Sequence, residues 1–126
     1  MGIFLEDLKA FLSGHVYNIF RDTMPDQPDD AVGLFLYAHA VGGINDGTGV
    51  RHVQVQVRRK DPDEAYTVAC ELCALLDSGV DEALIDLAPG RWCIARPTAL
   101  PKKLGVDESG RTTYYFETGL WGSNDP

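Results

Sequence analysis

The residues of this chain best suited to chemistry are Cys70 and Cys73, which are spaced as in redox and zinc sites, with Cys93 as the third cysteine. A redox pair lies at the N-terminus of a helix, where the helix dipole lowers the thiol pKa, but these two fall in the third turn of a predicted helix. A structural zinc site needs four ligands, so Cys93 and a histidine would have to complete one. We therefore predict core thiols with no intrachain disulfide, and the alternative is a metal or redox site.

The histidines and the acidic pairs are weaker candidates for a site. The three histidines, each expected in a strand, are His15, His39 and His52. Catalysis would need one of them beside a nucleophile and an orienting acid, and no serine or cysteine lies in an elbow motif. Asp29-Asp30 and Asp107-Glu108 lack the alternating oxygen ligands of a calcium loop. We predict no catalytic residue, no bound metal and no cofactor.

A glycine-rich stretch, GGINDGTG at 42–49, joins two predicted strands. Phosphate-binding loops run from a strand into a helix N-terminus, so this stretch is interpreted as a hairpin connection. Two tryptophans offer large apolar surfaces. Trp92 is expected to pack in the core, while Trp121 follows the last predicted strand, where it could anchor an interface.

Length and composition favour one globular domain over residues 1–126. The net charge of -8 and the pI near 4.6 disfavour tight binding to duplex DNA, because phosphate recognition needs a basic footprint. The odd cysteine count and the acidic N-terminus predict a protein of a reducing cytoplasm. No apolar run approaches the roughly 20 residues of a membrane span, so we expect no membrane partner.

The elements that must position these residues centre on 50–79. Val53, Val55 and Val57 alternate with polar residues, which predicts a strand with one buried face. A helix follows, with Asp61 as N-cap and Gly79 as its expected C-terminal stop. Leu72 and Leu76 are expected to face the valines.

The rest of the chain predicts an amphipathic N-terminal helix, strands at 15–20, 32–39, 91–99 and 112–120, and a loop at 24–30. The segment 32–39 fits a strand that is buried on both faces, and Glu108-Ser109-Gly110 marks a turn. The predicted fold class is α+β, a mainly antiparallel sheet with two helices packed on one face.

Several segments in order resemble a known family: MPDQPD at 24–29, VQVQVR at 53–58, EAY at 64–66, LGVDESGR at 104–111 and YYF at 114–116. Together they resemble the tail terminators of long-tailed bacteriophages and prophages, also described as minor capsid or tail-completion proteins. The resemblance implies a tail-terminator-like fold without catalytic residues. It also implies a hexameric ring that caps the tail tube, ends its elongation and docks on the head connector.

The partners implied by this resemblance are further copies of the chain, the tail tube protein and the head-connector protein. DNA would pass through the ring without specific binding. The protein would be made in the host bacterial cytoplasm and reside in the tail or neck of the virion. Candidate interface residues are Ile44, Asn45, Asp46, Thr48, Arg58 and Trp121. The alternatives are a small α+β hydrolase or a host ligand-binding module.

Overall fold

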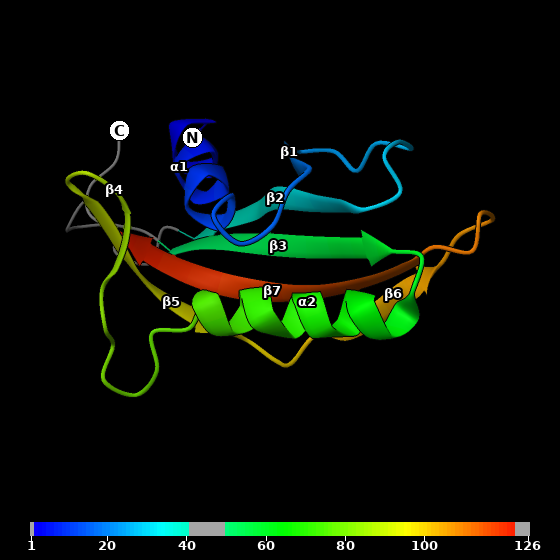
Figure 1. The fold of residues 1–126 in the computed structure, drawn as a ribbon. Helices are drawn as coiled ribbons and strands as arrows, with labels where there is room; N and C mark the ends of the chain where they lie inside the picture. The colour runs from blue at the N-terminus through cyan, green and yellow to red at the C-terminus, as the bar shows by residue number, and fades with distance from the viewer. Residues whose placement is uncertain (1, 41–49, 123–126) are drawn as a thin grey trace.

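The computed structural model describes residues 2–40 and 50–122, which form two helices and one seven-stranded sheet (Figure 1). In chain order these elements are α1 (Gly2–Leu12), β1 (Ile19–Arg21), β2 (Ala31–Ala40), β3 (Val50–Arg59), α2 (Pro62–Leu75), β4 (Ile85–Ala88), β5 (Arg91–Pro97), β6 (Lys102–Val106) and β7 (Thr112–Gly122). The strand order is β1-β2-β3-β7-β5-β4, and β6 pairs with the N-terminal half of β7. Among the described strands, β1 and β2 alone pair in parallel, so the predicted α+β class is confirmed.

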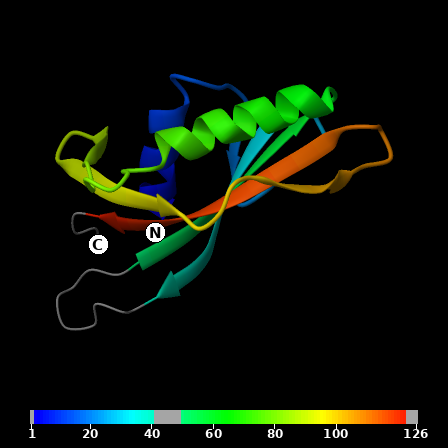
Figure 2. The same ribbon diagram turned by 90° about the horizontal axis from the view of Figure 1, so that it is seen from below.

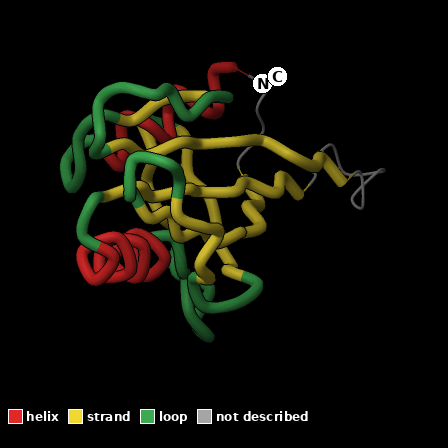
Figure 3. The backbone as a smooth tube through the Cα atoms, turned by 90° about the vertical axis from the view of Figure 1, so that its right-hand side faces the viewer, coloured by secondary structure: helices red, strands yellow, loops and turns green. Residues whose placement is uncertain are grey.

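The core lies on one face of the sheet, where both helices pack. Val53, Val55 and Val57 are fully buried in β3, as their alternation predicts. They share one apolar cluster with Leu72 and Leu76, which come from α2 and the residue after it. Leu5, Leu8 and Leu12 of α1 belong to the same cluster. Figure 3 looks along α2 and shows both helices on the same side of the sheet.

The start of α2 agrees with the sequence, but its end does not. The Asp61 side chain accepts a hydrogen bond from the backbone N–H of Asp63 at 2.9 Å, and Pro62 occupies the first helical position. The helix ends at Leu75, and Leu76 is its C-cap with φ -103°. The expectation that Gly79 stops the helix is wrong, because Gly79 adopts its φ of +75° in the following turn.

Two further differences concern short edge strands. The strand expected at 15–20 begins only at Ile19, because the backbone N–H groups of His15 and Val16 both donate to Leu12 and extend the last turn of α1. His15 is therefore in a turn. Strand β6 was not expected, because a Lys-Lys-Leu-Gly-Val sequence has no clear alternation. Pairing with β7 makes this segment a strand, which illustrates how strand formation depends on context.

Candidate functional site

The sheet face opposite the helices carries polar and aromatic side chains. Because β3 and β7 pair in regular register, the residues between the buried ones share this outer face. Gln54 Nε2 donates to Glu117 Oε2 at 3.2 Å across the two strands, and Gln56 Nε2 donates to Gln54 Oε1 at 2.7 Å. Two amides and one carboxylate thus form a hydrogen-bonded row on the outer face.

Two tryptophans lie at the β4–β5 end of the same face. Trp121 stands opposite Ile94 of β5, and Trp92 stands opposite Asp86 of β4. Their exposed fractions are 38% for Trp121 and 37% for Trp92. The expectation that Trp92 packs in the core is therefore wrong. Trp92, Ile94 and Trp121 form an apolar group that we call the tryptophan surface.

At the other end of the sheet, Arg111 holds together segments that are distant in sequence. Its side chain is only 5% exposed, its Nε donates to Asp107 Oδ2 at 2.8 Å, and its Nη2 donates to Asp26 Oδ1 at 3.0 Å. Nη1 also reaches Asp29 Oδ1 at 3.3 Å. The same cation therefore ties the 107–111 turn to the 24–30 loop.

Arg58, near the end of β3, binds the same loop through hydrogen bonds to its backbone. Its Nε donates to the Asp29 carbonyl oxygen at 3.0 Å, and its Nη2 donates to the carbonyl oxygens of Pro25 and Pro28, both at 2.6 Å. Burial and the nearby Arg111 charge lower the pKa of the Arg58 guanidinium, which nevertheless remains charged in proteins. We call Arg58, Arg111 and the carboxyl and carbonyl groups that they bind the arginine clamp.

Within the clamp, Asp107 also organises its own turn. Its Oδ1 accepts the backbone N–H of Arg111 at 2.9 Å and that of Ser109 at 3.0 Å. The hydrogen bond from the Arg111 backbone N–H contributes most to lowering the pKa of the Asp107 carboxyl. The Arg111 guanidinium and the Ser109 backbone N–H lower this pKa further. Gly110 takes a φ of +80° in this turn, a conformation that glycine adopts without steric cost. The chemistry of the clamp is structural, because each group binds another part of the chain.

The thiols of Cys73 and Cys93 are poor nucleophiles. Burial raises the pKa of Cys73 to about 11 and that of Cys93 to about 12, so both are protonated at neutral pH. The three thiols are free, and Cys70 is half-buried. Among residues 2–40 and 50–122, no three side chains of His, Cys, Asp or Glu are grouped to hold a metal ion.

The histidines are divided between two regions. His15 lies beside Phe11 with ring centroids 6.2 Å apart. His39 and His52 lie in adjacent strands, where His39 stands opposite Arg51 and His52 opposite Ala38.

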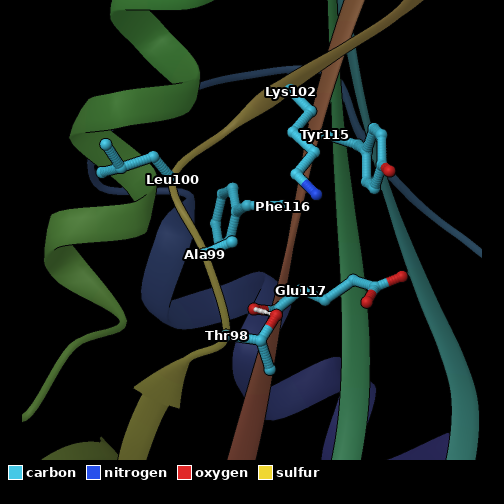
Figure 4. Close-up of a pocket in the computed structure, with 7 residues that line it drawn as sticks. All are labelled: Thr98, Ala99, Leu100, Lys102, Tyr115, Phe116 and Glu117. Carbon is cyan, nitrogen blue, oxygen red and sulfur yellow. Dashed lines mark hydrogen bonds between the residues drawn. The ribbon is translucent and has the colours of Figure 1, made fainter.

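One small pocket lies where the chain passes from β5 to β6 (Figure 4). Its volume is about 40 Å³, and its lining residues are Thr98, Ala99, Leu100, Lys102, Tyr115, Phe116 and Glu117. Thr98 closes one side, since its backbone N–H donates to the Glu117 carbonyl oxygen at 3.0 Å. Small-molecule sites usually measure about 300–1,000 Å³, so this pocket is too small to be one.

A wider depression of about 460 Å³ lies between the end of α1 and α2. Val16, Leu72 and Leu75 give it an apolar floor, and His15 and Glu71 stand at its rim. It lies on the helix side and not under the sheet, where the ligand-binding alternative requires an apolar pocket. Neither α1 nor α2 is long and apolar enough to cross a membrane.

The predicted interface residues fall in three places. Ile44, Asn45, Asp46 and Thr48 lie outside the described residues. Trp121 is on the outer face, within the tryptophan surface. Arg58 belongs to the clamp and is 5% exposed, so a subunit contact through this side chain stays a prediction. The sequence presents Asp107 only as part of an acidic pair and does not indicate that Arg111 joins it to Asp26, although the segments of all three residues are among the motifs that carry the family resemblance.

The polar clusters of this α+β fold bind the protein's own loops, and its tryptophans lie on an exposed sheet face. This arrangement is suited to assembly with other proteins. The chain matches the bacteriophage tail terminator family over residues 4–118 and belongs to that family. It is therefore assigned a structural role in a phage tail. No curated protein matches the chain.

Proposed function

We propose that this protein assembles as a hexameric ring on the end of the phage tail tube, stops tube elongation and joins the tail to the head connector. The observation that carries the proposal is the family match over residues 4–118. The family match does not specify a ring, a cap or a docking surface, and we infer these features from what a terminator must do. It has to contact the last ring of the tube protein on one side and the head-connector protein on the other.

The surface chemistry supports this role. The net charge of -8 suits a conduit for DNA, because a like-charged lumen would let DNA pass without holding it. We propose that residues 1–126 act as one domain, which is made in the host cytoplasm and ends in the neck of the virion. The tryptophan surface supplies exposed aromatic side chains of the kind that dominate binding energy in protein interfaces.

We propose that the Thr118–Gly122 segment and the 44–48 segment lie at subunit or tail contacts. Trp121→Ala should leave the monomer folded but weaken ring formation by about 30-fold or more, the effect of losing a hot-spot residue. Deletion of Ile44 to Thr48 should do the same. The matched control is Tyr66→Ala, because Tyr66 has a similar exposed fraction, 41%, but lies on α2 across the sheet.

The experiment combines light scattering of the purified variants with electron microscopy of tails assembled in their presence. Wild type and Tyr66→Ala should give rings and tails of uniform length, whereas the two interface variants should give overlong or uncapped tubes. Normal rings and normal tails from both interface variants would refute the placement of the contacts. A wild-type protein that stays monomeric even beside tail tubes would refute the function.

A further inference from the structure

Strand β6 carries an exposed surface that is both apolar and basic. Leu104 is 55% exposed and Val106 is 56% exposed, and a β-bulge between Lys103 and Gly105 interrupts the regular alternation of this strand. Lys102 and Lys103 are exposed at its start. Within the described sheet, β6 pairs only with β7, so its other edge is open. Lys102 lies opposite Tyr115 and Lys103 opposite Tyr114, so the two lysines flank this edge from the two faces of the sheet. The residues that line the open edge, which we call the basic patch, are Lys102, Lys103, Leu104 and Val106.

The lysines of this patch are adjacent and unpaired. Several other cations of the described residues are paired, namely Lys60 with Asp29, Arg91 with Asp7 and Arg96 with Glu82, whereas Lys9 is not. Lys102 and Lys103 have no ion pair with any carboxylate in the described ranges. In an acidic protein, two adjacent unpaired lysines beside exposed apolar side chains favour a partner that is itself acidic and apolar.

This chain carries such a surface around β4. Val80 is 98% exposed and Leu84 is 58% exposed, in the turn that leads into β4. Asp81 lies in the same turn, and Asp86 lies in β4, and both are exposed. Val80, Asp81, Leu84 and Asp86 form what we call the acidic patch.

The acidic patch is held in place before any partner binds. The Ser78 backbone N–H donates to the Ala95 carbonyl oxygen at 2.8 Å, and the Ala95 N–H donates to Ser78 Oγ at 2.9 Å. Arg96 binds Glu82 from the neighbouring strand. The turn is therefore tied twice to β5, and an ordered surface loses less conformational entropy on docking.

The two patches lie at opposite ends of the molecule. Figures 1 and 2 both place β6 at one end of the long strands and β4, with the turn before it, at the other. A contact between two different surfaces of identical chains is heterologous, and repetition of it closes a ring when the rotation per subunit allows. We propose that the basic patch of one subunit docks on the acidic patch of a second copy of this chain. This inference rests on the ring of the proposed function and assigns its subunit contact.

Lysines on an edge strand also have a simpler role, which is to prevent unwanted strand pairing. The two roles predict opposite results. If the lysines only protect the edge, their replacement by glutamate keeps the edge protected and leaves assembly unchanged. If they bind the acidic patch, the same replacement puts like charges together at every contact of the ring.

The test is a charge swap. Lys102→Glu with Lys103→Glu should weaken assembly at least about tenfold, because like charges at an interface are strongly unfavourable. Asp81→Lys with Asp86→Lys should do the same. A chain that carries all four changes again has opposite charges at each contact and should regain assembly. Glu71→Lys, an exposed reversal on α2 outside both patches, is the control and should assemble as wild type does.

Light scattering and microscopy with tail tubes measure assembly, and circular dichroism confirms that each variant is folded. Wild-type assembly should also weaken as salt rises, because ions screen exposed charges. Rings from wild type together with undiminished rings from both charge-reversed variants would overturn this contact and leave the proposed function intact. Failure of the four-change chain to regain assembly, while it remains folded, would also overturn the contact. Wild-type protein that forms no ring alone or on tubes would overturn the ring and this contact together.

Discussion

Leu72→Ala tests the packing of α2 on the sheet. Leu72 is fully buried in the cluster that includes Val53, Val55, Val57 and Phe116. The substitution removes three carbon atoms, and at about 0.8 kcal/mol per buried methylene the lost transfer free energy is about 2.5 kcal/mol. The residual cavity adds to this cost, since leucine-to-alanine changes in cores range over about 2–5 kcal/mol. We expect a loss of about 3–4 kcal/mol in the free energy of unfolding.

Urea-induced unfolding followed by circular dichroism measures this loss, and the slope with denaturant should not change. The melting temperature should fall by roughly 10–20 °C for a domain of this size. Leu84→Ala is the matched control, because Leu84 is 58% exposed and exposed sites usually change stability by less than about 0.5 kcal/mol. A loss below about 1 kcal/mol for Leu72→Ala would show that α2 does not pack against the valine row.

Three further predictions concern the buried thiols and the arginine clamp. Because burial raises the pKa of Cys73 to about 11 and that of Cys93 to about 12, the native state holds these protons more tightly than the unfolded state. Stability that is present below about pH 8.5, the unfolded thiol pKa, should therefore be lost as the pH rises through 11 and 12. Cys93→Ala should reduce this loss, which is measured as the free energy of unfolding at a series of pH values. Arg111→Met should release the 24–30 loop and speed amide hydrogen exchange there. The control is Arg96→Met, which breaks an exposed ion pair with Glu82 and should leave exchange in this loop unchanged. Equal exchange in both variants would contradict the clamp. Since the pKa of Asp107 is lowered in the fold, its stabilisation exists above the ordinary aspartate pKa and should disappear as the pH falls through the lowered value, more in wild type than in Arg111→Met.

The parts of the fold that the sequence predicts best are those with a local cause. The valine alternation of β3 and the Asp61 cap of α2 each depend on residues within a few positions, and both are confirmed. The strand at 32–39 is confirmed as β2, but the expected burial on both faces is wrong for part of it: Ala31 to Leu34 are buried, whereas Phe35 and Leu36 are half-buried. Phe35 is half-buried on the outer face, where no helix covers it.

The errors have a cause that lies outside the local sequence. Strand β6 forms because β7 offers it a hydrogen-bonding edge, and a local pattern cannot reveal that edge. Trp92 is exposed because β5 turns its even-numbered residues away from the core, although tryptophan is usually well buried. The turn at 76–84 ends α2 three residues earlier than a glycine signal predicts, since Leu76 already packs in the core and its carbonyl oxygen accepts from Thr118 Oγ1 at 3.2 Å.

The arginine clamp explains why several weak motifs together indicate one family. The MPDQPD loop contributes Asp26 and Asp29, the VQVQVR strand contributes Arg58, and the LGVDESGR turn contributes Asp107 and Arg111. These three segments are distant in sequence but meet in one network, in which a buried cation needs all of its oxygen partners. A change in one segment therefore leaves groups in the others unsatisfied, so the motifs depend on one another. The same reasoning separates the residues that hold the fold together from those at the surface. The clamp residues bind other parts of the chain, whereas charged and apolar side chains at β6 and β4 remain exposed, as the proposed subunit contact requires.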